Sequence, residues 1–303
     1  MYDCVVVGAG PAGMSASIYL ARQKLNFIVI SKDIGGQTLL SSDVENYLGF
    51  HFINGIELVA KFLEHMNDYK IEIREEEVRE VQKINETKFR VVTDAAEYES
   101  RTVLIATGKK PKKLNVPGED ELYGKGVTYC ATCDAPLFAK KDVAVVGGGN
   151  SAMDAALLAE KYSDRVYLAT INKNLVGDRI MMEKVNMSRK IEVIYNAKTK
   201  KITGRRVVEG IIIEVEGSER TIPVQGVFIE IGLIPSSNII NIVRKNEWGE
   251  IKLETRNFTD IPGIFAAGDV TEVAEKQIIV ASGEGAKAAL DVIEFLTKQR
   301  ISY

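Results

Sequence analysis

Two cysteines with two residues between them are the feature of this 303-residue chain that points most directly to chemistry. Cys130 and Cys133 stand in the run Cys130-Ala-Thr-Cys133-Asp134. This spacing brings two sulfurs close enough to exchange between dithiol and disulfide, and it lowers the pKa of one thiol so that thiolate is available. The third cysteine, Cys4, lies in an apolar run and is expected to be an inert core thiol.

A zinc half-site is the other chemistry that this cysteine pair allows. It would need two further ligands, and His51 and His65, the two histidines of the chain, lack ligand-like spacing. We therefore expect no metal. Three cysteines cannot build a disulfide framework, so the pair favours a catalytic role in a reducing compartment.

Two strand, glycine-turn and helix patterns must position this chemistry. The first has Gly8-Ala-Gly10-Pro11-Ala12-Gly13 after an apolar run, and the second has Gly147-Gly-Gly149-Asn-Ser-Ala152. Each turn leads into an alanine-rich helical stretch and a second apolar run, at 27–30 and 166–168. This is the βαβ pattern twice, so we expect two Rossmann-like domains.

The first turn suits a pyrophosphate, because its backbone N–H groups lie at a helix N-terminus. An acidic residue that binds ribose often follows near the end of the second strand of this pattern. This chain has Ser31 and Lys32 there, so the turn alone does not identify its ligand. The second turn either binds a nucleotide or serves close packing of helix on strand.

Shorter patterns fill the rest of the chain. Alternating apolar runs at 71–73, 89–92 and about 207–231 predict two smaller meanders. Residues 111–118 read as a linker, the chain after Pro235 reads as helical and loop-like, and 277–298 has helical spacing of Ala and Leu.

Bulk composition fits a two-domain globular enzyme, with 46% hydrophobic and 27% charged residues. A net charge of −3 gives no strong attraction to nucleic acid or anionic lipid. The apolar stretches are strand-length, and no signal peptide precedes the first motif. We expect a cytoplasmic protein with no nucleic-acid or membrane partner.

The order of these motifs resembles the low-molecular-weight thioredoxin reductases. The match spans nearly the whole chain, through GxGxxG, Gly-Gly-Gln, Ala-Thr-Gly, CATCD, GGGNSA and Ala-Ala-Gly-Asp-Val. It implies an α/β fold of two Rossmann-like three-layer domains and a homodimer. The second domain, at 114–244, would carry the CxxC and be inserted into an FAD domain made of 1–113 and 245–303.

The same resemblance implies where FAD binds. Asp269, after Gly268, would hold the ribityl chain of the flavin, although a turn aspartate is the structural alternative. The implied FAD-lining residues are Gly8, Gly10, Pro11, Ala12, Gly13, Ser31, Gly35, Gly36, Gln37, Asn46, Val78, Ala106, Thr107, Gly108, Gly268, Asp269, Lys276, Gln277 and Ile278.

It also implies roles for the redox pair. Cys133 would face the flavin, Cys130 would attack a protein disulfide, and Asp134 would exchange the proton. The family commonly has glycine after this aspartate, whereas this chain has Ala135 and Pro136. That departure affects the loop expected to move in catalysis.

The electron donor is where the chain departs most from the family. Its members bind the 2′-phosphate of NADPH with a His-Arg-Arg run, and the matching positions here are Thr170, Ile171 and Asn172, with Val176 near a further arginine position. These side chains cannot supply a cationic fork, which should cost about a hundredfold or more in affinity. Lys173 and Arg179 could substitute in part.

The chain therefore resembles the ferredoxin-dependent flavin thioredoxin reductases, and we expect reduced ferredoxin as donor and thioredoxin or a thioredoxin-like protein as acceptor. Candidate docking cations occur at 109–113, 140–141, 198–201 and 205–206. An NADPH- or NADH-linked thioredoxin reductase is one alternative. A second is the flavoprotein of a peroxide-reducing system, whose extra N-terminal domain finds no room before Met1. A ferredoxin–NADP reductase or a flavin-binding sensor would not need the cysteine pair.

Overall fold

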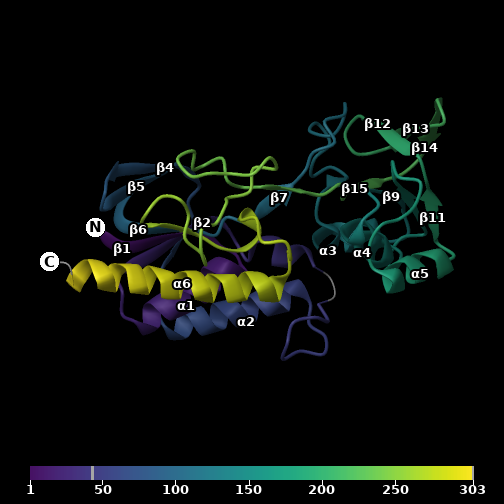
Figure 1. The fold of residues 1–303 in the computed structure, drawn as a ribbon. Coiled ribbons are helices and arrows are strands. Elements are labelled where there is room, and N and C mark those ends of the chain that lie inside the picture. Colours follow the sequence, from purple (N-terminus) through teal and green to yellow (C-terminus); the bar gives the residue numbers. More distant parts are fainter. Residues whose placement is uncertain (42–43, 302–303) are drawn as a thin grey trace. The chain divides into compact units, whose positions relative to one another are not determined.

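The computed structural model describes residues 1–41 and 44–301, and it divides the chain into two compact units (Figure 1). Unit 1 comprises 1–110 and 234–303, of which 302–303 lie outside the described residues, and unit 2 comprises 111–233. The α/β fold with a second domain inserted into the first is confirmed. The divisions fall at 110/111 and 233/234, whereas the sequence placed them at 113/114 and 244/245. Residues 234–244 go with unit 1 because Ile240 and Val243 are buried in its core.

Unit 1 is built on a seven-stranded sheet with the order β3-β2-β1-β6-β5-β4, in which β17 also pairs with β6. β1, β2, β3, β6 and β17 pair in parallel, and β4, β5 and β6 form an antiparallel meander. The strands are β1 (Tyr2–Ala9), β2 (Phe27–Ile34), β3 (Ile73–Arg74), β4 (Val78–Asn85), β5 (Lys88–Thr93), β6 (Glu97–Ile105) and β17 (Ile264–Ala266).

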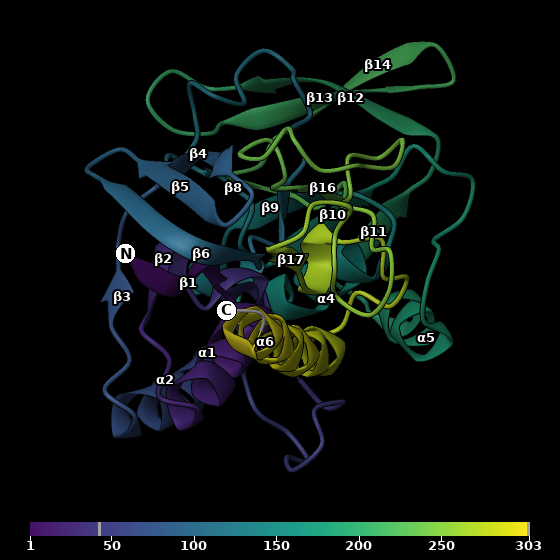
Figure 2. The ribbon, with the colours of Figure 1, turned by 60° about the vertical axis from the view of Figure 1, so that its left-hand side comes forward.

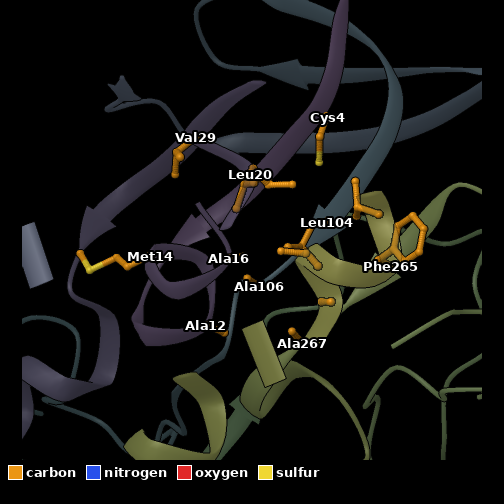
Figure 3. Packing of buried hydrophobic residues seen from close by; sticks show 14 of the residues in the cluster. Cys4, Ala12, Met14, Ala16, Leu20, Val29, Leu104, Ala106, Phe265 and Ala267 are labelled. Carbon is orange, nitrogen blue, oxygen red and sulfur yellow. The ribbon is translucent and has the colours of Figure 1, made fainter. Parts of the chain in front are cut away.

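Helices cover one face of this sheet, as Figure 2 shows for α1, α2 and α6. They are α1 (Pro11–Arg22), α2 (Gly55–Asp68) and α6 (Ile278–Ile301), with short 3₁₀ turns η1 (Gly36–Leu40) and η3 (Gly268–Val270). Proline at the first position of α1 suits a helix start, because its missing N–H would have no partner there. The buried layer between sheet and helices contains Cys4, Leu20, Leu104 and Phe265 (Figure 3).

Unit 2 holds a parallel sheet with the order β11-β10-β9-β15-β8 and a three-stranded antiparallel sheet, β12-β13-β14. Its strands are β8 (Val127–Thr128), β9 (Asp142–Val146), β10 (Arg165–Ala169), β11 (Ile191–Ile194), β12 (Ala197–Thr203), β13 (Gly210–Val215), β14 (Ser218–Ile222) and β15 (Gly226–Ile229). Its helices are α3 (Ala131–Asp134), η2 (Ala135–Phe138), α4 (Asn150–Ala159) and α5 (Arg179–Met187). The connecting strands β7 (Lys109–Pro111) and β16 (Leu233–Pro235) pair with each other.

Three local expectations needed correction. The run at 71–73 ends in β3, which pairs in parallel with β2 and does not join a meander. The second meander is β12-β13-β14, and β15 instead enters the parallel sheet beside β9, where all four of its residues are buried. The chain from 236 to 263 forms bridges and turns without a helix, because it covers the second face of the unit 1 sheet with isolated apolar side chains such as Ile251.

Candidate active site

The first glycine-rich turn joins β1 to α1 and leaves open space at the helix N-terminus. A Cβ on Gly8 would lie 2.4 Å from the carbonyl oxygen of Ala106, and one on Gly13 would lie 1.8 Å from that of Gly8. A Cβ on Gly10 would meet nothing within 4 Å. Gly10 also caps α1 without a side-chain hydrogen bond. The outer glycines are thus required by close packing, while the middle one borders a place where an anion can approach the helix dipole.

The Gly268–Asp269 motif meets this helix start although it lies 250 residues further along the chain. Gly268 has φ +75°, and a Cβ on it would lie 3.0 Å from the Cβ of Ala12. A Cβ on Gly285 in α6 would lie 1.9 Å from the Ala12 carbonyl oxygen, so small residues let α6 touch the first turn of α1. Ala12, Ala106 and Ala267 belong to one buried cluster (Figure 3). The first glycine-rich turn and the Gly268–Asp269 segment of unit 1 therefore lie side by side.

An ion-pair network lies beside Asp269. Glu250 accepts from Lys109 at 2.9 Å and pairs with Lys276 at 3.0 Å through the same oxygen, and its other oxygen accepts from Asn246 at 2.7 Å. Burial alone would raise the pKa of Glu250, but the hydrogen bonds from Asn246, Lys109 and Lys276 bring it down to about 2. Burial raises the pKa of Asp269, with Lys276 and Lys109 opposing that shift. Lys276 further donates to the Asp269 and Thr271 carbonyls.

We expect Glu250→Gln to destabilise unit 1 by about 2 kcal/mol at neutral pH, because it leaves two partly buried ammonium groups without their anion. A carboxyl with a lowered folded-state pKa stabilises above its unfolded pKa of 4.5 and ceases to do so toward pH 2. The difference in unfolding free energy between Glu250→Gln and the wild type should therefore shrink as the pH falls from 4.5 toward 2. Urea unfolding at several pH values measures it.

The matched control is Glu64→Gln, which removes a carboxylate from an exposed pair with Lys61 on α2. It should leave unfolding unchanged, because exposed pairs contribute little. An equal loss of stability in both variants at neutral pH would contradict the role given to Glu250.

Hydrogen bonds hold several predicted FAD residues in place, and one of them joins two members of the set. Asn46 donates to the side chain of Gln277 at 3.0 Å, which joins segments 231 residues apart. Gln37 donates to the Lys109 carbonyl at 3.2 Å. The Ser31 hydroxyl accepts from the backbone N–H at the end of β1 at 3.0 Å, so it fastens the first turn.

The other predicted FAD residues lie in the same unit. Gly35 and Gly36 both have positive φ, and a Cβ on Gly36 would lie 3.4 Å from the Gly10 Cα. Ile278 begins α6, whereas Val78 begins β4 as a buried core residue. The remaining members lie at the crossover out of β6 and in the first turn of α1, namely Thr107, Gly108 and Pro11.

Two residues of this site, Ser236 and Glu250, were not predicted from the sequence. Thr107 donates its hydroxyl to the Ser236 carbonyl at 2.8 Å, and the Ser236 N–H donates to the Gly108 carbonyl at 2.9 Å. Glu250 is the second omission. Neither residue belongs to a short motif, so the sequence carries no local signal for it.

The redox pair lies in unit 2, where Cys130 and Cys133 form a disulfide with Cα atoms 5.4 Å apart. Cys130 precedes α3, its N–H donates to the Thr128 hydroxyl, and its Sγ accepts from the Cys133 N–H at 3.1 Å. Cys133 is exposed and Cys130 is partly buried. Asp134 ends the four-residue helix. Cys4, by contrast, is fully buried, and this burial raises the pKa of its thiol to about 12, which makes it unreactive.

The second glycine-rich turn is tied by hydrogen bonds to the segment that follows β10. The Val176 N–H donates to the Gly148 carbonyl at 2.8 Å, and Asn150 accepts from the Asp178 N–H at 2.8 Å. At the end of β10, Thr170 is buried, while Ile171 is 72% exposed where a 2′-phosphate would need a cation. The structure therefore places apolar and neutral side chains at this position, with Lys173 and Arg179 exposed nearby in sequence.

Unit 2 is an α/β unit that carries a CxxC disulfide, and it is inserted into a unit with a dinucleotide-binding type of glycine turn. This arrangement defines a disulfide oxidoreductase. The family model described as "Pyridine nucleotide-disulphide oxidoreductase" matches residues 2–285. The chain belongs to this family. Its members include FAD-binding flavoproteins of the thioredoxin reductase type, and FAD is the cofactor of this chain.

Solved structures and a curated relative agree with that assignment. Thioredoxin reductase of Lactococcus lactis (FR conformation) is 31% identical, with a TM-score of 0.93 over 98% of this chain and 100% of that one. A ferredoxin-flavin thioredoxin reductase of Clostridium acetobutylicum is 31% identical, with a TM-score of 0.55 over 98% of both.

An alkyl hydroperoxide reductase component of Staphylococcus aureus is 38% identical over 98% of this chain. This chain spans 59% of that relative's length. The resemblance to thioredoxin reductases is thereby confirmed. Within the described residues, no helix has both the length and the apolar character needed to cross a bilayer.

Proposed function

We propose that this protein uses FAD to reduce the disulfide of thioredoxin or a thioredoxin-like protein, with reduced ferredoxin as its electron donor. The observation that carries the proposal is the Cys130–Cys133 disulfide, with Cys133 exposed, in a chain that belongs to this family. Bound FAD accepts electrons singly or in pairs and can deliver a pair to a disulfide. The cysteine chemistry fits a reducing compartment such as the cytoplasm.

The residues of the chain divide this work. Gly10 and the N-terminus of α1 would hold the pyrophosphate of FAD, Asp269 would hold its ribityl chain, and Lys276, held by Glu250, would contribute a fixed cation. Bound FAD would supply the electrons that Cys133 accepts, Cys130 would attack the substrate disulfide, and Asp134 would exchange a proton.

The donor side rests on the end of β10. NADPH recognition wants planar cationic donors for its 2′-phosphate, and Thr170, Ile171 and Asn172 provide none. One of the solved structures similar to this chain is a ferredoxin-flavin thioredoxin reductase. Both observations favour a one-electron protein donor over NADPH.

A reconstituted reaction tests the overall activity. The FAD-loaded protein is mixed anaerobically with reduced ferredoxin and oxidised thioredoxin, and new thioredoxin thiols are counted. We expect two thiols for every two ferredoxins oxidised. Oxidation of ferredoxin without new thiols would contradict disulfide reduction as the function.

Three of the candidate docking cations already have a partner within the chain. Lys109 pairs with Glu250, Lys113 pairs with Asp120, and Lys141 lies 5.6 Å from the centre of the Phe138 ring. The β12 cluster on unit 2 gathers four exposed cations, Lys198, Lys201, Arg205 and Arg206. Ferredoxin is typically acidic, so this cluster is the proposed docking surface.

We expect Lys201→Glu with Arg205→Glu to slow flavin reduction by ferredoxin about tenfold or more at low ionic strength, because steering depends on charge complementarity. Stopped-flow flavin absorbance at several salt concentrations measures this, and the variant should show a weaker salt dependence. The matched control, Lys184→Glu with Arg189→Glu, reverses two exposed cations on and after α5. Equal slowing by both pairs would exclude a specific docking surface.

We also propose a homodimer formed through unit 1. Leu48 is 89% exposed, Phe52 56% and Ile56 54% in one short stretch of the chain. Tyr47, which precedes them, lines an apolar hollow together with Met14, Ile18 and Phe62. Apolar side chains exposed together in this way favour a protein interface. Sedimentation of the FAD-loaded protein should give twice the chain mass of 33.4 kDa. A monomer at micromolar concentration would contradict the proposal.

A peroxide-reducing system is the second candidate, favoured by the 38% identity to the alkyl hydroperoxide reductase component. In that case a separate small redox protein would carry electrons from Cys130 and Cys133 to the peroxidase. Ordinary NADPH or NADH dependence is the third, through Lys173 and Arg179. Hydrogen peroxide consumption with a peroxidase partner would favour the second candidate.

A further inference from the structure

Glu230 lies at the same edge of the unit 2 sheet as the redox pair. β8 and β15 run in parallel, with Thr128 paired to Phe228 as the last registered residues. Cys130 and Glu230 each stand two residues beyond that pair. Neighbouring strands are about 4.8 Å apart, so the two chains leave the sheet side by side at its carboxyl edge. This is the edge at which parallel sheets carry their functional groups.

A comparison of the two glycine-rich turns shows that packing does not require a carboxyl at position 230. In unit 1, Ala106 follows β6, donates its N–H to Val7, and its carbonyl closes on Gly8. In unit 2, Glu230 follows β15, donates its N–H to Val146 at 2.8 Å, and its carbonyl closes on Gly147 in the same way. The backbone roles are equivalent, yet one unit has a methyl group and the other an acid.

The surroundings of this acid favour its neutral form. Burial, and after it the negative charge of Asp154 on α4, raise the pKa of Glu230 to about 8. Asp134 and the two cysteines lie at this edge of unit 2 as well, on or next to α3, which packs against α4. A carboxyl that changes charge near pH 8 is matched to a thiol of ordinary pKa near 8.5.

We propose that Glu230 is the proton-exchange partner of Cys130, alongside Asp134 at Cys133. The inference rests on the proposed function, since it assigns a proton path to the same dithiol. Glu230 takes the proton from the Cys130 thiol as its sulfur attacks the substrate disulfide. A Cys130–substrate S–S bond forms, the substrate S–S bond breaks, and Glu230 passes the proton to the departing sulfur.

The second half of the exchange restores the protein disulfide. Cys133 gives its proton to Asp134 and attacks the Cys130 sulfur, and the second substrate sulfur leaves with that proton. Two electrons and two protons thus move from the protein dithiol to the substrate. Every atom is accounted for without another reactant.

The test reads the Cys130 thiol directly. In a Cys133→Ser background, Cys130 is the one redox-site thiol and Cys4 is buried. The FAD-loaded protein is treated with dithiothreitol, desalted and alkylated with iodoacetamide from pH 6 to 10.5, and modification of Cys130 is followed by mass spectrometry. With Glu230 present, the titrations of Glu230 and Cys130 are coupled, so the alkylation rate of Cys130 should rise with pH in two steps.

Adding Glu230→Gln should reduce the curve to a single-proton step whose midpoint is lower by about half a pH unit or more, because the Glu230 carboxylate no longer opposes thiolate formation. Glu209→Gln, which removes an exposed carboxylate on the loop before β13, is the matched control and should leave the two-step curve unchanged. Superimposable curves with and without Glu230→Gln would overturn the inference.

These outcomes are separable from the proposed function, because alkylation needs neither ferredoxin nor thioredoxin. An unshifted curve together with thioredoxin turnover by the wild type would remove Glu230 and leave the function intact. A shifted alkylation curve without thioredoxin turnover would support the role of Glu230 and contradict the proposed function.

Discussion

Cys133→Ser is expected to lower thioredoxin reduction by about a thousandfold or more while leaving FAD bound. A serine hydroxyl cannot open or close a disulfide, so Cys130 would be left without the sulfur that resolves its bond to the substrate. FAD should be retained because the glycine turn and Asp269 lie in unit 1, whereas the cysteines lie in unit 2. Thiol release from thioredoxin and the flavin absorbance of the purified variant measure both effects.

Cys4→Ala is the control for this result. It removes the third thiol of the chain, which is buried in the unit 1 core and unreactive at neutral pH. Its turnover per bound FAD should equal that of the wild type, although the small cavity left behind will lower its stability. Turnover by Cys133→Ser above one tenth of the wild-type rate would show that electrons bypass the pair.

Gly10→Ala is expected to weaken FAD binding by about tenfold or more without preventing folding. The added Cβ meets no atom of the chain within 4 Å, and Gly10 has φ −85°, which alanine adopts freely. The methyl group would instead occupy the space through which a pyrophosphate approaches the backbone. Titration of the FAD-free protein with FAD gives the affinity, and circular dichroism checks the fold.

The second turn supplies a matched substitution. A Cβ on Gly149 would lie 3.9 Å from the Val176 carbonyl oxygen and closer to nothing else outside its chain neighbours. Gly149→Ala should therefore fold, keep its FAD, and reduce thioredoxin with ferredoxin at the wild-type rate, because the proposed donor is a protein that does not need this turn. A large loss of turnover in Gly149→Ala alone would show that the second turn still binds a nucleotide.

The sequence predicted the features that depend on neighbouring residues. Each βαβ unit was recognisable because glycine spacing, an apolar run and a small-residue helix stand together within about 30 residues, and α1, α4 and α6 were found near their expected places. The cysteine pair was recognisable for the same reason.

Features that depend on distant contacts were harder to predict. The apolar run of β15 looks like a hairpin strand in isolation, and its place beside β9 follows from burial on both faces. The second domain boundary was set too late because Ile240 and Val243 contribute to a core formed by the first segment. Glu250 joins Lys109 to Lys276, and the whole inserted unit lies between Lys109 and Glu250 in the sequence. No local pattern indicates such a contact.

The donor is decided most directly by anaerobic mixing of the oxidised flavoprotein with each candidate in turn. Reduced ferredoxin should bleach the flavin absorbance within the mixing time of a standard assay. NADPH at micromolar concentration should leave the absorbance unchanged, because Thr170, Ile171 and Asn172 offer no cation for its 2′-phosphate at the end of β10. NADH should do the same, because these residues offer no carboxylate for its ribose hydroxyls. Rapid bleaching by micromolar NADPH, with no response to ferredoxin, would contradict the account.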